Sequence, residues 1–197
     1  MANLMGMHLA GESLVRFLQH SYNKTEMSKT ISVAFVQFGT GNIPEKTPGK
    51  ITIGLTLYRV GWNEHLRSHA PSPRRKAGPL ALDLYYLVSS WGGNAHDEQV
   101  PFAWTLLQLH QTPILDSSIL RGEANWSPSE YIEMVPQDLP HDELSRIWDK
   151  LSAPFRLSAA YVARVIRLEP HKNYEEFLPV VARRTEMYSN ASEERDQ

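Results

Sequence analysis

The stretch RRKAGPLALDLYYLVSSWGG, residues 74–93, joins a basic loop to a strand that carries a carboxylate. The loop begins with three cations, at positions 74 to 76, and the glycine and proline that follow favour irregular backbone. The residues from 80 to 89 are rich in leucine and aromatic side chains, a composition typical of a β-strand. Asp83 lies inside this segment, where an unpaired buried carboxylate would be costly. The sequence therefore predicts a strand at 80–89 in which Asp83 needs a partner.

Segments on both sides of this strand have the composition of further strands. ITIGLTLYRV, residues 51–60, alternates isoleucine and leucine with threonine, glycine and tyrosine, so it predicts a strand with one buried face. SAAYVARVIRLE, residues 158–169, predicts a strand with one apolar face and one face that carries arginines. The segment from 39 to 50 combines glycine, proline and asparagine, which indicates a loop. Shorter strands are expected at 30–38 and 132–135.

Three segments have apolar residues at the spacing of an amphipathic helix. They span about residues 4–21, 97–113 and 141–151, and the second and third begin with acidic residues that suit a helix N-terminus. Helices placed between strands with polar faces indicate a single α+β domain with a mixed or antiparallel sheet. We expect the helices to cover one face of that sheet.

The composition excludes several classes of protein. The chain has 197 residues, 42% of them apolar, and a formal net charge of −2, so it can bury a core but offers no overall positive charge to a polyanion. It has no cysteine, which excludes disulfides, thiolate zinc sites and a cysteine nucleophile. The N-terminal residues lack the pattern of a signal peptide, and no apolar run is long enough to span a membrane. We therefore expect neither a nucleic-acid partner nor a membrane partner.

No set of residues has the spacing of a catalytic or metal site. His65 and His69 have the spacing of a helical metal pair, but their polar, proline-containing segment predicts a loop. GTGNIP, which begins at Gly39, resembles a dinucleotide fingerprint but places Pro44 where the third glycine belongs. GESLV around Ser13 lacks the last glycine of a hydrolase elbow. The sequence therefore predicts no enzyme, no metal site and no cofactor.

Five blocks of sequence occur in the order found in a known family. They read LTLYRVGWNEHLRS, RRKAGPLALDLYYLVSSWG, LLQLHQTPIL, MVPQDLPHDELSRIWDKL and RLSAAYVARVIRLEP, and the resemblance covers roughly residues 4 to 170. Together they resemble the N-terminal domain of the cap, or tail terminator, protein of extracellular contractile injection systems, such as antifeeding prophages and Photorhabdus virulence cassettes. The match departs from the family at Arg67, which is followed by Ser68 where the family usually has asparagine.

The resemblance implies a phage tail-terminator-like fold and a structural function. A cap of this family forms a homohexameric ring on the distal end of the tube and sheath and stops further polymerisation. Its partners would be copies of itself and the sheath and inner tube proteins of the same particle, which is assembled in the bacterial cytoplasm and can be released. Such a ring needs one interface that closes on itself and a second surface that matches the last layer of the polymer. The alternative is a stand-alone protein-binding module of the same fold with a different partner.

Asp83 and several cations are the candidate interface residues. On one interpretation Asp83 lies on the less buried face of its strand and pairs with a nearby arginine such as Arg156 or Arg164. On the other it contacts a neighbouring subunit, and the basic run before it reaches that subunit or an acidic patch on the sheath or tube. The same run is equally consistent with a solvated loop. The candidate interface residues are Arg67, Arg74, Arg75, Lys76, Asp83, Arg156, Arg164, Arg183 and Arg184.

The resemblance ends near residue 170 and so divides the chain. Residues 1–170 are expected to form the cap domain, and residues 171–197 a C-terminal arm or tail. Within the second segment, residues 178–187 have the composition of a strand. That strand either completes the sheet of its own subunit or binds as an arm to an exposed sheet edge of another.

Overall fold

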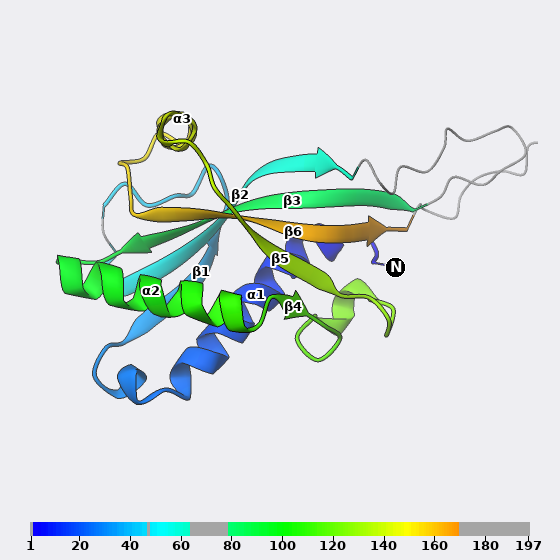
Figure 1. The fold of residues 1–197 in the computed structure, drawn as a ribbon, viewed down its shortest axis with the longest axis horizontal. Helices are drawn as coiled ribbons and strands as arrows, with labels where there is room; N and C mark the ends of the chain where they lie inside the picture. Colours follow the sequence, from blue (N-terminus) through cyan, green and yellow to red (C-terminus); the bar gives the residue numbers. More distant parts are fainter. Residues whose placement is uncertain (1, 47, 64–78, 170–197) are drawn as a thin grey trace, which may run out of the picture.

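One sheet carries the strands of residues 2–46, 48–63 and 79–169, which are the residues that the computed structural model describes (Figure 1). Its order is β1-β2-β3-β6-β5-β4. The strands are β1 (Val33–Phe38), β2 (Ile51–Trp62), β3 (Leu80–Trp91), β4 (Ile114–Leu115), β5 (Ile132–Gln137) and β6 (Ser158–Leu168). The helices are α1 (Gly6–Asn23), α2 (Ala95–Gln111) and α3 (His141–Lys150), with short 3-10 helices η1 (Glu26–Lys29) and η3 (Gly122–Ala124).

The sheet is mixed, because its first pair of strands is parallel and the other pairs are antiparallel. β1 runs parallel to β2, and its last residue, Phe38, pairs with Thr56. The remaining neighbours, from β2–β3 to β5–β4, are antiparallel. The predicted α+β class with a mixed sheet is confirmed. β2 and β3 end at Trp62 and Trp91 rather than at the predicted 60 and 89, because the two strands continue to pair with each other.

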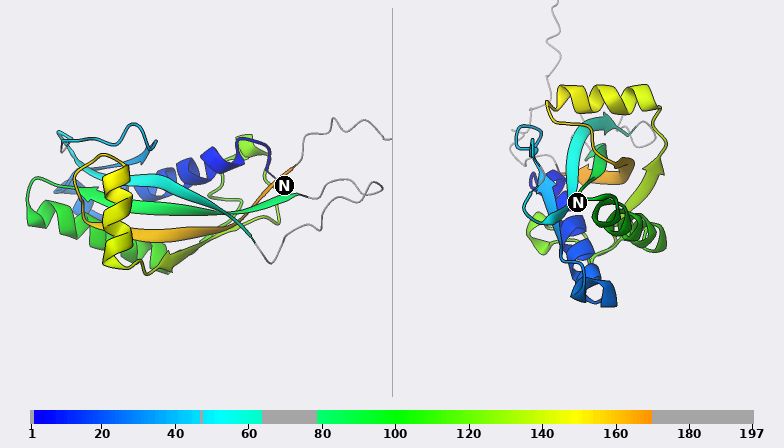
Figure 2. Two further views of the ribbon diagram at one scale, coloured as in Figure 1. Left: turned by 90° about the horizontal axis from the view of Figure 1, so that it is seen from above. Right: turned by 90° about the vertical axis from the view of Figure 1, so that its left-hand side faces the viewer.

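The main core lies between the sheet and the helices α1 and α2, which lie on the same side of it (Figure 2). Leu14 of α1, Leu84 of β3 and Ile166 of β6 have no exposed surface. Tyr22 of α1 packs edge-on against Trp104 of α2, with ring centroids 4.9 Å apart. Each fully buried leucine or isoleucine stabilises the fold by roughly 1.5–3 kcal/mol. This core holds the strands in place beneath the loops and edges that face solvent.

α3 packs on the opposite face of the sheet, so the expectation that helices cover one face is wrong (Figure 2). Its Trp148 is buried against Trp91 of β3, with ring centroids 6.2 Å apart. Gly54 of β2 makes room for this layer, because a Cβ atom there would lie 2.5 Å from the rings of both Phe38 and Trp91. Thr52 and Thr56, which alternation places on the same face as Gly54, are buried as well. The first half of β2 therefore has two buried faces instead of the predicted one.

The N-terminus is bound to the end of β6. The amide of Ala2 donates to the carbonyl of Arg167 at 2.9 Å, and the amide of Glu169 donates to the carbonyl of Ala2 at 2.8 Å. This bridge, β4 and the 3-10 helices are not expected from the sequence, because elements this short have no periodic pattern. The strand expected at 178–187 lies outside the described residues. Within the described part of the chain, no helix is long and apolar enough to cross a membrane.

Candidate functional site

Three candidate interface residues lie in the described part of the chain. Asp83 is in β3, Arg156 lies just before β6 and Arg164 is within β6. Arg164 is exposed, whereas Arg156 is half-buried and its Nε atom has no hydrogen-bond partner among the described residues. The other candidates lie outside the described residues: Arg67, Arg74, Arg75, Lys76, Arg183 and Arg184.

Asp83 is buried and pairs with a neutral amide. Only 9% of its surface is exposed, and the Nδ2 group of Asn63 donates to both carboxylate oxygens, at 3.1 and 3.2 Å. Neither Arg156 nor Arg164 forms an ion pair with it, so the interpretation of a less buried Asp83 paired with an arginine is wrong. The strand register explains this partner. Gly61 of β2 lies opposite Asp83, so Asn63, two residues further along the chain, is close enough for its side chain to bond the carboxylate. A contact between Asp83 and another subunit stays a prediction.

The second half of β2 carries an exposed arginine that the sequence analysis did not select. The guanidinium carbon of Arg59 lies 4.6 Å from the centroid of the Tyr85 ring, a cation–π distance. Tyr58, the preceding residue, donates to Oε1 of Gln137 at 3.3 Å, and burial raises the pKa of its phenol. Alternation along β2 indicates a strand at this point, but only the register with β3 brings Arg59 opposite Tyr85.

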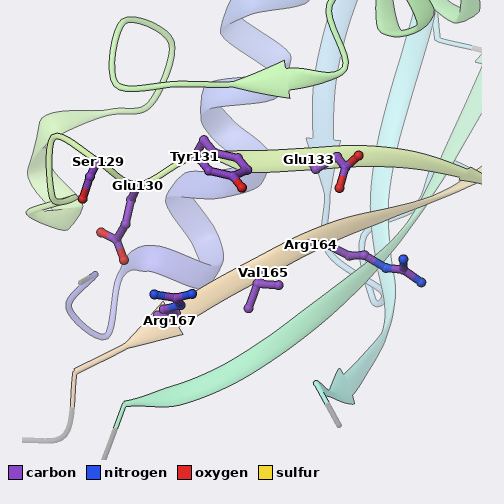
Figure 3. A pocket seen from close by; sticks show the side chains of 7 residues that line it. All are labelled: Ser129, Glu130, Tyr131, Glu133, Arg164, Val165 and Arg167. Atoms are coloured by element: carbon purple, nitrogen blue, oxygen red, sulfur yellow. The ribbon is translucent and has the colours of Figure 1, made fainter. Parts of the chain in front are cut away.

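A polar pocket of about 230 Å³ lies between β5 and β6 (Figure 3). Figure 3 shows Glu130 and Arg167 at one end of it and Glu133 and Arg164 at the other. Glu133 and Arg164 are register partners in the pairing of β5 with β6. Two acids and two arginines line it, so their formal charges balance and give no net charge that would favour one charged ligand. Its lining is Ser129, Glu130, Tyr131, Glu133, Arg164, Val165 and Arg167.

A cluster of charges holds the segment after β4 against α1. The guanidinium of Arg121 donates to the carboxylates of Glu12 and Glu123, and its backbone amide donates to Oγ of Ser13 at 3.0 Å. The hydrogen bond from Arg121 lowers the pKa of the Glu123 carboxyl. The charged groups of this cluster are hydrogen-bonded to one another, so the cluster has a structural role. The described residues contain no group of side chains that could hold a metal ion.

Comparison with known proteins identifies a family of domains. The chain matches the family described as the Pvc16 N-terminal domain over residues 10–182. No curated protein matches the chain.

Two solved structures are similar to this one. The first is the sheath/tube terminator, in its extended state, of the extracellular contractile injection system PVC; it is 19% identical, has a TM-score of 0.52, and the similarity covers 96% of this chain and 65% of that chain. The second is the tube-terminating cap of the anti-feeding prophage, with 19% identity, a TM-score of 0.45, and 74% and 54% of the two chains covered. This chain therefore spans less than two thirds of either of those chains. The first similarity shows a shared fold.

Proposed function

Because the chain belongs to the Pvc16 N-terminal domain family, we propose that it is a terminator, or cap, subunit of a contractile injection particle. In this role it forms a homohexameric ring on the distal end of the tube and sheath and stops their polymerisation. The observation that carries the proposal is the family match over residues 10–182, which agrees with the order of the five sequence blocks. The fold shared with a sheath/tube terminator supports the same assignment.

The proposed partners are further copies of the chain and the sheath and inner tube proteins of its particle. The particle is assembled in the bacterial cytoplasm and becomes extracellular on release. The function is binding without catalysis, so it depends on the shape and charge of surfaces. In this proposal residues 1–170 form the ring domain and residues 171–197 an arm or tail.

The interface is assigned to a basic run of the sequence and to an exposed arginine of β6. The basic run Arg74, Arg75 and Lys76 precedes β3 in the chain and would meet an acidic surface of a neighbouring subunit or of the sheath. Arg164, which is exposed beside the pocket between β5 and β6, would make a second such contact. Asp83 is held by Asn63 inside its own subunit, so its proposed part is to support the strand that follows the basic run.

The test of this proposal is the assembly state of the full chain. Its mass in solution is measured with and without tube and sheath proteins, and the same samples are imaged by negative stain. We expect a closed ring of six copies, alone or on tube ends, and tube growth that stops when the chain is added. A chain that stays monomeric in all of these samples at high concentration contradicts the proposal and favours a stand-alone binding module.

A charge-removal variant tests the assigned interface. Replacing Arg74, Arg75 and Lys76 together by serine should leave thermal stability nearly unchanged and weaken attachment to tube ends, because the attraction between charged surfaces is lost. The matched control replaces three other exposed cations, in and after α1, by serine: Arg16, Lys24 and Lys29. Attachment that is equal in the two variants contradicts the assignment of the interface, while the ring itself is judged by the mass measurement.

A further inference from the structure

Among the strands that the structure describes, none lies beside the outer edge of the second half of β2. β1 stops pairing at Phe38 and Thr56, whereas β2 continues to Trp62 with β3 as its neighbour on the inner side. Figure 1 shows this part of β2 running beside β3 at the margin of the sheet. Among the described strands, none pairs with the residues from Leu57 to Trp62 on the outer side. This segment is defined here as the open edge.

The backbone groups of Val60 and Trp62 point away from β3 along the open edge. The amide of Asn63 donates to the carbonyl of Ala81 in the β3 segment at 3.1 Å, so the backbone of Asn63 faces β3. In an antiparallel pair the residues that face the partner alternate, and Gly61 therefore faces β3 as well. The N–H and C=O groups of Val60 and Trp62 face outward and can receive a further strand.

The side chains of the open edge form one apolar side and one cationic side. Val60 and Trp62 are 44% and 62% exposed, and alternation places them on the same side of the strand. Arg59 and Gly61 lie on the other side. Because Gly61 has no side chain, it does not cover the ring of Tyr85. A strand added here would meet large apolar side chains on one side and a guanidinium on the other.

At the other margins of the described sheet, several outward backbone groups are already bonded or missing. On β1, Nε2 of Gln19 donates to the carbonyl of Val33 at 3.2 Å, and its Oε1 accepts from the amide of Phe35 at 3.1 Å. A carboxamide has the donor and the acceptor of a peptide group, so it occupies this edge as a strand would. At the opposite margin β4 is two residues long, and Pro136 of β5 has no N–H. The open edge is therefore the place in the described sheet that is built to accept a strand.

We propose that the open edge docks an extended segment of a different protein by strand addition. The segment has apolar residues facing Val60 and Trp62 and alternates them with an acidic residue that faces Arg59. A second copy of the chain fits less well, because two-fold pairing of two open edges brings both Arg59 side chains to the same face, where like charges repel. The inference rests on the strand register and does not depend on the proposed ring.

The test uses the full chain and synthetic extended peptides as probes. One peptide alternates valine with glutamate, a second alternates valine with lysine, and a third has the composition of the first in scrambled order. Fluorescence anisotropy measures binding, and amide hydrogen exchange at Val60 and Trp62 locates it. We expect the valine–glutamate peptide to bind best and to protect both amides.

Two variants at one position separate backbone pairing from side-chain contact. Val60→Pro removes the outward N–H and should weaken binding roughly tenfold or more, whereas the control Val60→Thr keeps that N–H and should retain most of the affinity. Arg59→Glu should make the valine–lysine peptide bind better than the valine–glutamate peptide. This variant provides a test of the proposal even if the proline variant fails to fold. The proposal is overturned if no peptide protects the two amides, if the proline and threonine variants bind equally, or if the amides become protected in the protein alone as its concentration rises.

Discussion

The two halves of β2 share β3 as a neighbour but differ in what lies on their other side and on their faces. The first half, from Ile51 to Thr56, lies between β1 and β3 and is covered on both faces, by α1 and α2 on one side and by α3 with its aromatic partners on the other. The second half, from Leu57 to Trp62, has β3 on one side and no described strand on the other. The neighbours of a strand, more than its own composition, therefore decide whether it is core or surface.

The change from one half to the other occurs at an irregularity in the strand. The register between β2 and β3 shifts between Leu57 and Arg59, which is a position where an extra residue is accommodated. Tyr58 lies at this shift and reaches Gln137. Beyond it the sheet no longer lies under α3, and Arg59 and Trp62 are exposed.

The largest expected difference between the halves comes from adding one methyl group to each. Gly54→Ala should lower the free energy of unfolding by about 2–3 kcal/mol, because its Cβ atom would lie 2.5 Å from two packed aromatic rings. Gly61→Ala should cost less than about 1 kcal/mol, because its Cβ atom would meet only the ring of the half-buried Tyr85, at 2.9 Å. Urea denaturation of both variants measures the difference. Equal losses would show that the two halves are packed alike.

A smaller effect is expected from uncovering the closed edge of β1. Gln19→Ala removes the two bonds to Val33 and Phe35 and should cost about 1–2 kcal/mol. It should also promote self-association, which sedimentation velocity detects, because β1 then offers its own open backbone groups. Arg16→Ala, at an exposed position of the same helix, is the control and should change neither quantity. A Gln19 variant that stays as stable and as monodisperse as the control would remove the contrast between closed and open edges.

Tyr85 and Tyr86 are adjacent in β3, so their side chains lie on opposite faces of the sheet, and the two differ in burial. Tyr86 is fully buried, its hydroxyl has no hydrogen-bond partner among the described residues, and burial raises its pKa above the ordinary 10.0. Above pH 10 the unfolded chain therefore releases this proton while the folded chain keeps it, so stability falls as pH rises. Tyr86→Phe should change stability at neutral pH by no more than about 1 kcal/mol and reduce the alkaline loss.

The control for this titration is Tyr85→Phe, which keeps the ring beneath Arg59. Thermal unfolding followed from pH 8 to pH 11 compares the two variants with the wild type, and these pH limits are about the range in which tyrosine begins to ionise. We expect the Tyr85 variant to follow the wild type more closely than the Tyr86 variant does. The reverse order would contradict the burial of the Tyr86 side chain.

The smallest effect is expected at the open edge itself. Replacing Val60 and Trp62 together by lysine should change the free energy of unfolding by no more than about 0.5 kcal/mol per site, because both side chains are largely exposed. The same pair of changes at Ile53 and Leu55, which are 2% and 3% exposed, should prevent folding. Circular dichroism of both double variants measures this contrast. Marked unfolding of the Val60 and Trp62 variant would place that half of β2 in the core.

Much of the secondary structure could be predicted from local pattern. The alternation in β2, the leucine and aromatic content of β3 and the helical spacing in α3 all correspond to elements of the structure. The side of the sheet that α3 covers could not be predicted, because its pattern shows an apolar face but not which surface that face meets. The candidate site was predicted less well. Asp83 was expected to have an arginine partner, whereas Asn63 bonds it. No sequence pattern indicated the contacts of Asn63 and Arg59, because they depend on the register between β2 and β3.

The classes of the elements and the resemblance to a family could be read from the sequence, because they depend on residues close together in the chain, and the lack of cysteine follows from composition alone. Long-range contacts place Asn63 against Asp83 and the rings of Phe38 and Trp91 against Gly54, and they leave β2 without a described partner on its outer side beyond Thr56. The physical reason is that burial and strand pairing depend on which distant segments become neighbours. The same alternating strand is stabilised as core where β1 and α3 reach it, and its side chains are largely exposed where they do not.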